Sequence, residues 1–440
     1  MRCFRLSRAS CGALICILIS QAFSQFTQQG GKLVGTDAAG RMVTQGCSVS
    51  LSSDGNTAIV GGLMDNSNVG AAWVFTRTGG VWSQQGTKLV GTGAVGSAAQ
   101  GGSVSLSSDG NTAIVGGMYD NNYAGAAWVF TRSNGVWSQQ GTKLVGTGAV
   151  GSAYQGSSVS LSSDGNTAIV GGYTDNFSAG ASWVYTRSSG VWSQQGTKLV
   201  GTGAVGSAYQ GFSVSLSSDG NTAIVGGYAD NSNAGASWVY TRSGGVWSQQ
   251  GTKIVGTGAV GSAYQGSSVS LSSDGSTAIV GGYCDNLLAG ATWIFTSPVV
   301  FGVSQDWNMV SVPVTLSDSR KASAFPSSIS PAFAYDQGVG YVQKDTLKNG
   351  LGYWLKFATS ERVTTAGVRR YVDTVDVKIG WNMIGTISNP ALIDSVVQIP
   401  PGLVASRYYG YNGSYTNADT LKPGAGYWVK VNQNGKLVIR

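Results

Sequence analysis

The hydrophobic and polar positions of this chain recur in a fixed order over most of its length. The segment SVSLSSDGNTAIVGG begins at Ser48 and returns almost unchanged at Ser103, Ser158, Ser213 and Ser268. The spacing is 55 residues each time. A period of this size, with several strands in each unit, is typical of a β-propeller or a solenoid.

Each unit contains the pattern of four strands. SVSLSS alternates serine with apolar residues, as does a strand with two unlike faces. Asp-Gly predicts a tight turn, and the apolar TAIVGG predicts a strand buried on both faces. After a loop, ASWVYTR and VWSQQGTKLVG predict a third and a fourth strand. Four antiparallel strands per unit indicate a propeller blade, whose faces are buried by stacking on its neighbours.

The two ends of the repeated region suggest a closed ring. The segment FTQQGGKLVG at 26–35 matches the fourth strand of a unit, and the fifth unit lacks a fourth strand of its own. We therefore predict an all-β fold: a five-bladed propeller over 25–297, in which the N-terminal strand completes the last blade. Closure would remove exposed sheet edges, which favour aggregation. The sequence leaves open whether the ring closes within one chain or by exchange between two.

A second duplication follows the first, at a spacing of 74 residues. DWNMVSVPV parallels GWNMIGTIS, and DTLKNGLGYWLKF parallels DTLKPGAGYWVKV. Apolar and aromatic alternation between glycine turns predicts two small β modules, over 298–373 and 374–440. We interpret their Trp-Asn and Tyr-Trp pairs as core and turn residues. This pair of modules resembles a C-terminal module often attached to secreted or surface proteins of bacteria, and this resemblance implies a role in surface attachment.

The first 24 residues have the pattern of a secretory signal peptide. Three arginines precede a short apolar stretch, and Ala22 and Ser24 occupy the small-residue positions of a cleavage site. The apolar stretch is too short to cross a bilayer. We therefore expect cleavage near Ser24, a secreted or cell-surface location and no membrane span.

Catalytic side chains are scarce. The chain has no histidine, the commonest general base, and Glu361 is the one glutamate. The net charge is +7 without a basic cluster, which argues against nucleic-acid binding. We therefore predict a binding protein rather than an enzyme. A hydrolase or lyase stays a less favoured alternative, which a central pocket with two or more carboxylates would support.

The order of features in each unit resembles that of the FG-GAP repeat, the blade of the integrin α-subunit propeller, and more closely its secreted bacterial form. The residues that carry the resemblance are GxSVSLSSDGNTAIVGG, followed by DN, GAxWVFTR, Trp and KL, within 26–297. The integrin-type head usually has seven blades. Many FG-GAP blades bind calcium through an Asp-rich loop, but here Ser52 and Ser53 precede Asp54 where further acids would stand. Because calcium prefers six to eight oxygen ligands, we expect no metal or other cofactor.

Differences between the five copies gather in two loops, which an antiparallel blade places on the same face. One loop follows the second strand and the other precedes the first strand. Aromatic residues are common in both, and rigid aromatic side chains are typical of recognition surfaces. The candidate ligand-binding residues are Tyr119, Tyr154, Tyr173, Phe177, Tyr209, Tyr228, Tyr264 and Tyr283. The alternative is that exposed loops simply vary freely.

Other repeated residues are interpreted as structural. Trp73 and its copies are expected to pack between blades, and the Asp65–Asn66 pair and its copies to form turns with their own backbone. Cys47 and Cys284 would lie in neighbouring blades of a closed ring, so a disulfide between them is a hypothesis. The expected function is non-catalytic adhesion to a protein or glycan through the loop rim. The alternative is a lectin-like propeller with one sugar site per blade gap.

Overall fold

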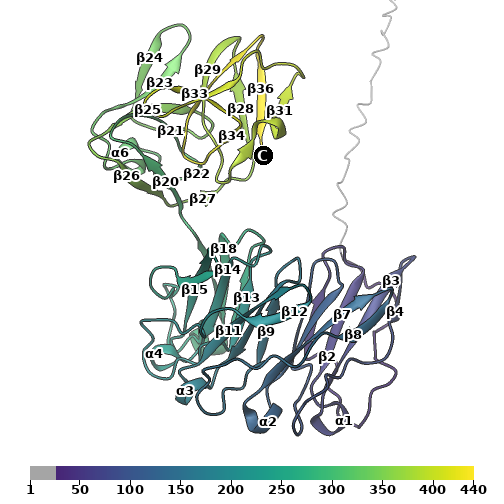
Figure 1. The fold of residues 1–440 in the computed structure, drawn as a ribbon. Coiled ribbons are helices and arrows are strands. Elements are labelled where there is room, and N and C mark those ends of the chain that lie inside the picture. The colour runs from purple at the N-terminus through teal and green to yellow at the C-terminus, as the bar shows by residue number, and fades with distance from the viewer. Residues whose placement is uncertain (1–25) are drawn as a thin grey trace, which may run out of the picture.

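The computed structural model describes residues 26–440, which form an all-β protein with two regions (Figure 1). The signal-peptide prediction lies outside the described residues. Residues 26–297 build five consecutive antiparallel sheets, and residues 299–439 build the strands of a C-terminal region. No helix within 26–440 is long and apolar enough to cross a membrane.

The first four sheets have four strands each, in chain order. The first sheet comprises β1 (Ser48–Leu51), β2 (Thr57–Gly62), β3 (Ala71–Thr78) and β4 (Val81–Gln84). The second comprises β5 (Ser103–Leu106), β6 (Thr112–Gly117), β7 (Ala126–Ser133) and β8 (Val136–Gln139). The third comprises β9 (Ser158–Leu161), β10 (Thr167–Gly172), β11 (Ala181–Ser188) and β12 (Val191–Gln194). The fourth comprises β13 (Ser213–Leu216), β14 (Thr222–Gly227), β15 (Ala236–Ser243) and β16 (Val246–Gln249).

The fifth sheet has three strands, β17 (Ser268–Leu271), β18 (Thr277–Gly282) and β19 (Ala291–Thr296). In every sheet a short turn follows the second strand, and three of its residues have positive φ angles. These turns are α1 (Asp65–Asn68), α2 (Asp120–Tyr123), α3 (Asp175–Ser178), α4 (Asp230–Asn233) and α5 (Asp285–Leu288). The predicted strands and Asp-Gly turns are therefore present in all five units.

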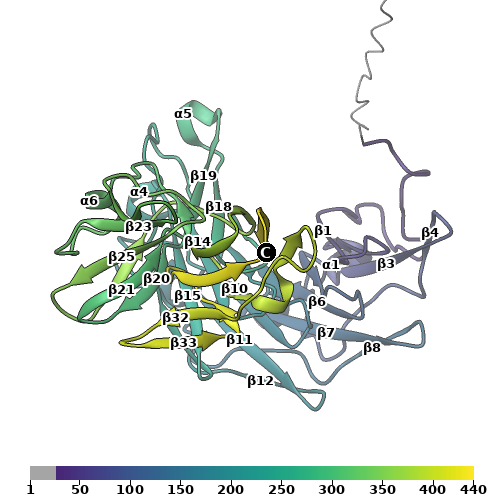
Figure 2. The ribbon, with the colours of Figure 1, turned by 90° about the horizontal axis from the view of Figure 1, so that it is seen from above.

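The five sheets are arranged as in a propeller-type fold. Their first strands lie side by side, because the backbone N–H of Ser53 donates to Ser108 O, and equivalent bonds link each unit to the next as far as Ser273. From these neighbouring first strands, the other strands of each sheet extend outward (Figure 2). Ile59 and Val74 of the first sheet pack against Val104 and Leu106 of the second. Neighbouring units thus bury each other's apolar faces.

A tryptophan on a glycine fixes each sheet to the segment that leads into it. A Cβ on Gly91 would lie 2.0 Å from Trp128 Cδ1, so only glycine fits beneath the indole. Four further pairs repeat this contact: Gly35 with Trp73, Gly146 with Trp183, Gly201 with Trp238, and Gly256 with Trp293. Trp128 is fully buried and donates its indole N–H to Thr92 O. Trp128, Trp183 and Trp238 therefore pack between units, as predicted, whereas Trp73 packs against the N-terminal segment and Trp293 is half-buried.

The N-terminal segment lies on the first sheet, and the prediction that it pairs with the last one is wrong. Gly35 is covered by Trp73, Trp73 Nε1 donates to Asp37 Oδ1, and Thr36 N donates to Gln84 Oε1. The physical reason is that QQGTKLVG is largely not a strand. It is the connection that carries the chain into the next sheet, so its N-terminal copy belongs before the first sheet.

Both ends of the array consequently expose apolar faces. Ile279 of the fifth sheet is 41% exposed and Ile294 is 61% exposed, whereas Ile59 and its other copies are fully buried. At the opposite end Val49 is 68% exposed, whereas its copy Val104 is 8% exposed. The faces that stack inside the array are therefore uncovered at its two ends.

The C-terminal region consists of two similar sets of strands. The first set is β20 (Val299–Val303), β21 (Asp306–Ser311), β22 (Val314–Thr315), β23 (Ala332–Asp336), β24 (Gly340–Lys344), β25 (Gly352–Phe357), β26 (Glu361–Thr365) and β27 (Val368–Arg369), with α6 (Lys321–Ala324). The second set is β28 (Asp373–Val377), β29 (Gly380–Ile384), β30 (Ala391–Leu392), β31 (Val397–Ile399), β32 (Tyr408–Tyr411), β33 (Tyr415–Ala418), β34 (Thr420–Leu421), β35 (Tyr427–Val431) and β36 (Gly435–Ile439), with a 3-10 turn at Ile393–Ser395.

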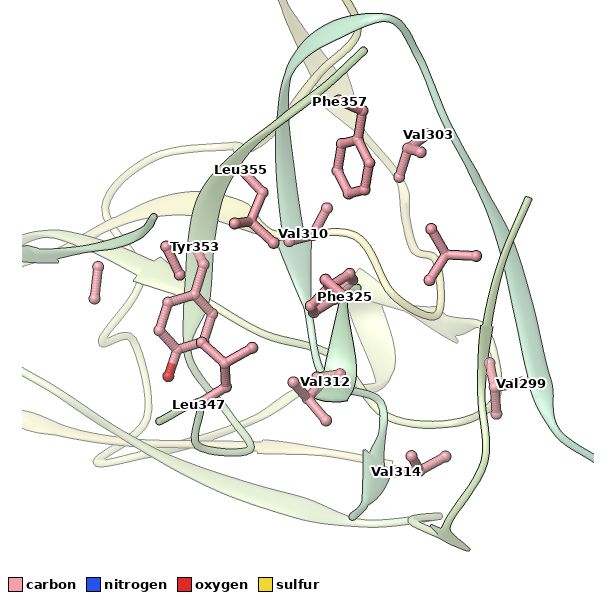
Figure 3. Packing of buried hydrophobic residues seen from close by; sticks show 14 residues of the cluster. Val299, Val303, Val310, Val312, Val314, Phe325, Leu347, Tyr353, Leu355 and Phe357 are labelled. Carbon is pink, nitrogen blue, oxygen red and sulfur yellow. The ribbon is translucent and has the colours of Figure 1, made fainter. Parts of the chain in front are cut away.

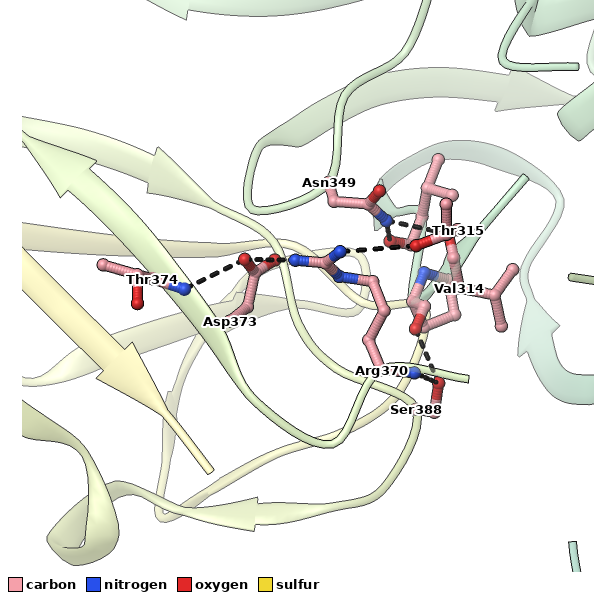
Figure 4. A network of polar contacts seen from close by, with 9 residues as sticks. Val314, Thr315, Asn349, Arg370, Asp373, Thr374 and Ser388 are labelled. Atoms are coloured by element: carbon pink, nitrogen blue, oxygen red, sulfur yellow. Dashed lines mark hydrogen bonds and ion pairs between the residues drawn. The ribbon is translucent and has the colours of Figure 1, made fainter. Parts of the chain in front are cut away.

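Equivalent four-stranded sheets, β21-β25-β23-β24 and β29-β35-β32-β33, form the centre of the two sets. Each set has its own apolar core. Phe325, Leu355 and Phe357 lie in the first core (Figure 3), and Leu403, Val429 and Leu437 lie in the second. The sets are joined by a polar network around Arg370 (Figure 4). The Arg370 guanidinium binds Asp373 Oδ1 at 2.5 Å and Thr315 Oγ1 at 3.3 Å, and its backbone N–H donates to Ser388 Oγ.

Candidate functional site

Two loops in each unit bring the predicted tyrosines to one end of the array. Tyr173, Tyr228 and Tyr283 directly follow the Gly-Gly pair that ends a buried strand. Tyr154, Tyr209 and Tyr264 lie in the connections between sheets and have left-handed backbone angles, with φ of 56°, 57° and 56°. The Tyr154 N–H donates to Tyr123 O at 2.9 Å, which ties the connection to α2. Both loops therefore hold their tyrosines in fixed positions.

The rings form one continuous line across the second to fifth units, which we call the tyrosine ladder. Ring centroids of contacting members are 4.5–6.0 Å apart. Several pairs are stacked, including Tyr173 with Tyr209 and Tyr264 with Tyr283. In chain order the ladder contains Tyr119, Tyr123, Tyr154, Tyr173, Tyr209, Phe212, Tyr228, Tyr264 and Tyr283.

The ladder unites seven of the eight residues selected from the sequence. Phe177 stands apart: it is 89% exposed in α3 and has no aromatic partner among the described residues. Two members, Tyr123 and Phe212, were not selected. Tyr123 occupies the place of Asn68 and Ser178 in other copies. Comparing this position between the copies could therefore have found it. Phe212 was visible as a variable position before its strand, and it packs edge-on against Tyr173 and Tyr228.

A buried aspartate anchors each ladder loop. Asp175 is fully buried, accepts the Val150 N–H at 2.7 Å, and forms an ion pair with Lys198 at 2.5 Å. Val150 lies in the connection that enters the unit, and Lys198 lies in the connection that leaves it. The aspartate thus joins both connections to the loop. The expectation that the Asp-Asn pair makes turns with its own backbone misses this role, because the lysine partner is 23 residues away.

A pocket of about 560 Å³ lies at the beginning of the ladder. It combines aromatic and amide side chains, which is the usual mixture for a small-ligand site. Its lining residues are Asn68, Val95, Gly96, Ser97, Tyr119, Asn122, Tyr123 and Tyr154. The pocket therefore offers aromatic faces together with hydrogen-bond donors and acceptors.

Burial favours the uncharged form of three ladder phenols. Burial raises the pKa of Tyr173, and the neighbouring hydroxyl of Tyr154 raises it further. Burial likewise raises the pKa of Tyr154 and of Tyr228. These three phenols consequently keep their protons and remain able to donate hydrogen bonds. This surface suits an uncharged ligand with polar groups.

The Asp-Gly turns at the other end of the sheets do not fit a calcium ion. Asp54 Oδ1 accepts hydrogen bonds from Ser52 Oγ and Asn56 N, and Oδ2 accepts one from Asn56 Nδ2. These bonds lower the pKa of Asp54 to about 2. The single carboxylate is thus occupied by its own turn, and it lacks the further oxygen ligands that calcium requires. Within 26–440 no three His, Cys, Asp or Glu side chains cluster as a metal site would.

A cavity of about 290 Å³ lies where the first strands of all five units meet. Its lining is one leucine and one serine from each unit: Leu51, Ser53, Leu106, Ser108, Leu161, Ser163, Leu216, Ser218, Leu271 and Ser273. This lining contains no carboxylate. The feature that would have favoured a propeller hydrolase or lyase is therefore missing from this cavity.

The two cysteines of the described chain are free. Cys47 is exposed and Cys284 is partly buried, and they form no disulfide. The hypothesis of a bond between them depended on a closed ring. Because the N-terminal segment lies on the first sheet, that premise is absent.

Comparisons with known proteins do not show a family for this chain. No protein-family model matches the chain, and no curated protein matches it. Among solved structures, TolB from Acinetobacter baumannii is similar to 57% of this chain at 13% identity, with a TM-score of 0.35. The matched part spans about half of that protein, 51%. The function therefore has to be argued from the residues themselves.

Proposed function

We propose that this protein is a secreted, non-catalytic adhesion protein whose tyrosine ladder binds a glycan chain. The observation that carries the proposal is the continuity of the ladder, which extends over four units on a single face. Stacked aromatic rings suit the apolar faces of sugar rings, and repeated rings suit a repeated ligand.

The pocket at the start of the ladder supports a glycan over a protein ligand. Sugars present hydroxyl groups that both donate and accept hydrogen bonds. The amides of Asn68 and Asn122 and the hydroxyl of Ser97 line this pocket beside Tyr119 and Tyr154, and they match that requirement. The phenol hydroxyls of the pocket add further hydrogen-bonding groups.

The same proposal includes an assignment of the five sheets and of the C-terminal region. We propose that the five sheets are five blades of the FG-GAP type, displayed outside the cell, and that the C-terminal region attaches them to a surface. The order of strands, the Asp-Gly turns and the Trp on Gly contacts within each unit support this assignment. In the lectin-like alternative, each gap between neighbouring blades has its own sugar site. Several short sugars would then bind independently, instead of one extended glycan chain.

The test is binding of the full mature chain to a glycan array, followed by calorimetric titration of the best ligand. Tyr209→Asn removes a central ring while keeping a residue type that adopts the left-handed backbone of this position. We expect it to weaken binding about tenfold, equivalent to about 1.4 kcal/mol.

Phe177→Ala is the control, since it removes an exposed aromatic ring that lies outside the ladder. It is expected to leave the affinity unchanged. The proposal is overturned if no glycan binds, or if the two variants weaken binding equally. A stoichiometry near one short sugar per gap would favour the lectin-like alternative.

A further inference from the structure

The C-terminal duplication places two pairs of tryptophans at equivalent positions. Trp307 on β21 lies opposite Lys356, and Trp381 on β29 lies opposite Lys430. On the adjoining strands, Trp354 lies opposite Met309 and Phe333, while Trp428 lies opposite Met383 and Tyr409. The two central sheets therefore carry the same aromatic arrangement.

Each arrangement is completed by tyrosines from the other set of strands. Tyr335 of the first set packs edge-on against Trp428 of the second, with ring centroids 4.8 Å apart. Tyr411 of the second set packs against Trp354 of the first, also at 4.8 Å and edge-on. Because the exchange is reciprocal, the two sets together form two similar pockets.

The pockets have volumes of about 520 and 500 Å³ and are open to solvent. Every lining residue is aromatic. The first is lined by Tyr335, Trp381, Tyr409, Tyr415 and Trp428, and the second by Trp307, Phe333, Tyr341, Trp354, Tyr411 and Tyr415. Tyr415 lines both, so the pockets adjoin and form one aromatic groove.

The indole N–H groups distinguish this groove from a packed core. All nine tryptophans of the repeat array donate their N–H to an acceptor within the protein. Across residues 26–440, no hydrogen bond uses the indole N–H of Trp307 or Trp381, which are 38% and 40% exposed. The partly exposed indoles of Trp307 and Trp381, whose N–H groups have no acceptor within 26–440, thus point to a ligand that carries hydrogen-bond acceptors.

The chemistry of the lining narrows the ligand class. The groove contains indole and phenol groups but no carboxylate or amide side chain, and its indole N–H groups can donate hydrogen bonds but cannot accept them. A sugar would find acceptors for its hydroxyl groups only at the phenol oxygens. A proline-rich peptide presents rings and carbonyl oxygens, and proline has no backbone N–H that would need an acceptor. Its polyproline II helix repeats every three residues, which suits two similar adjoining pockets.

We propose that the aromatic groove between the two C-terminal sets binds a proline-rich segment of a partner protein in the polyproline II conformation. Pyrrolidine rings fill the two pockets, and the N–H groups of Trp307 and Trp381 donate to peptide carbonyl oxygens. This site is independent of the tyrosine ladder.

The test is titration of the full mature chain with a short polyproline peptide, followed by intrinsic tryptophan fluorescence. An Ala-Gly peptide of equal length and a neutral oligosaccharide serve as comparison ligands. We expect the polyproline peptide alone to bind. Trp381→Ala should weaken its binding at least about tenfold, and Trp381→Phe, which keeps a ring but removes the N–H, by about threefold.

Tyr209→Asn is the control that separates this proposal from the glycan proposal, because it alters the ladder alone. It should leave peptide binding unchanged. The proposal is overturned if polyproline does not bind, if Trp381→Phe binds as weakly as Trp381→Ala, or if the oligosaccharide occupies the groove and its binding is lost in Trp381→Ala.

Discussion

Four tryptophans of the repeat array and those of the C-terminal region have different roles: the first are buried packing residues, and the second line open pockets. In the repeat array Trp73, Trp128, Trp183 and Trp238 are fully buried, each on a glycine, and each donates its N–H internally. In the C-terminal region Trp307 and Trp381 line open pockets with their donors free. Both regions are duplicated β structures, so duplication alone does not decide the role of an aromatic residue. In the array, the glycine beneath each of these four indoles lets the ring lie flat against the segment that leads into its sheet.

The largest expected effect tests this difference directly. Trp183→Ala removes a fully buried side chain between two sheets, and we expect a loss of about 3–5 kcal/mol in the free energy of unfolding. Trp381→Ala removes a side chain that is 40% exposed, and we expect a loss of about 1 kcal/mol or less. Chemical denaturation measures both. Equal losses would contradict the comparison.

A smaller effect is expected from the glycine beneath the indole. The Cβ of Gly146→Ala would lie 2.1 Å from Trp183 Cδ1, so the indole has to shift, at an expected loss of about 1–3 kcal/mol. Gly31→Ala is the matched control, because no atom lies within 4 Å of its Cβ. It should change the free energy of unfolding by less than about 0.5 kcal/mol. If Gly146→Ala is equally harmless, the indole does not depend on that glycine.

The smallest effect concerns the contact between the two regions. Burial alone would raise the pKa of Asp274, but hydrogen bonds from Ser272 and Ser276 outweigh it and lower the pKa to about 2. Ser276 also contacts the Tyr371 hydroxyl of the C-terminal region at 2.8 Å. Because the folded pKa lies below the unfolded value of about 3.9, the carboxylate stabilises the fold above about pH 4. That contribution is lost as the pH falls through about 2.

Asp274→Asn should therefore flatten the dependence of thermal stability on pH between about 4 and 2. The same substitution at Asp336, which lies at the exposed end of β23 in the C-terminal region, provides the control. An unchanged pH profile in the Asp274 variant would show that this carboxylate does not contribute.

The regular part of the fold was predictable because the repeats align strands, turns and loops without ambiguity. The position of the N-terminal segment was not, since QQGTKLVG reads as a continuation of a strand. The contacts that place it, Trp73 on Gly35 and Asp37 with the indole N–H, become visible only in three dimensions. Most of the ladder was predictable from variation between copies. The aromatic groove was missed because its pockets need tyrosines from both halves of the duplication.

The buried Asp–Lys pairs have a consequence for how such an array changes in size. Each connection is fastened at one point to the sheet it leaves and at another to the sheet it enters, as Lys198 with Asp175 and the Val205 N–H with Asp230 illustrate. A whole unit carries everything needed to join two neighbours. Gain or loss of one unit in the gene would therefore alter the reach of the protein without requiring compensating changes elsewhere in the chain.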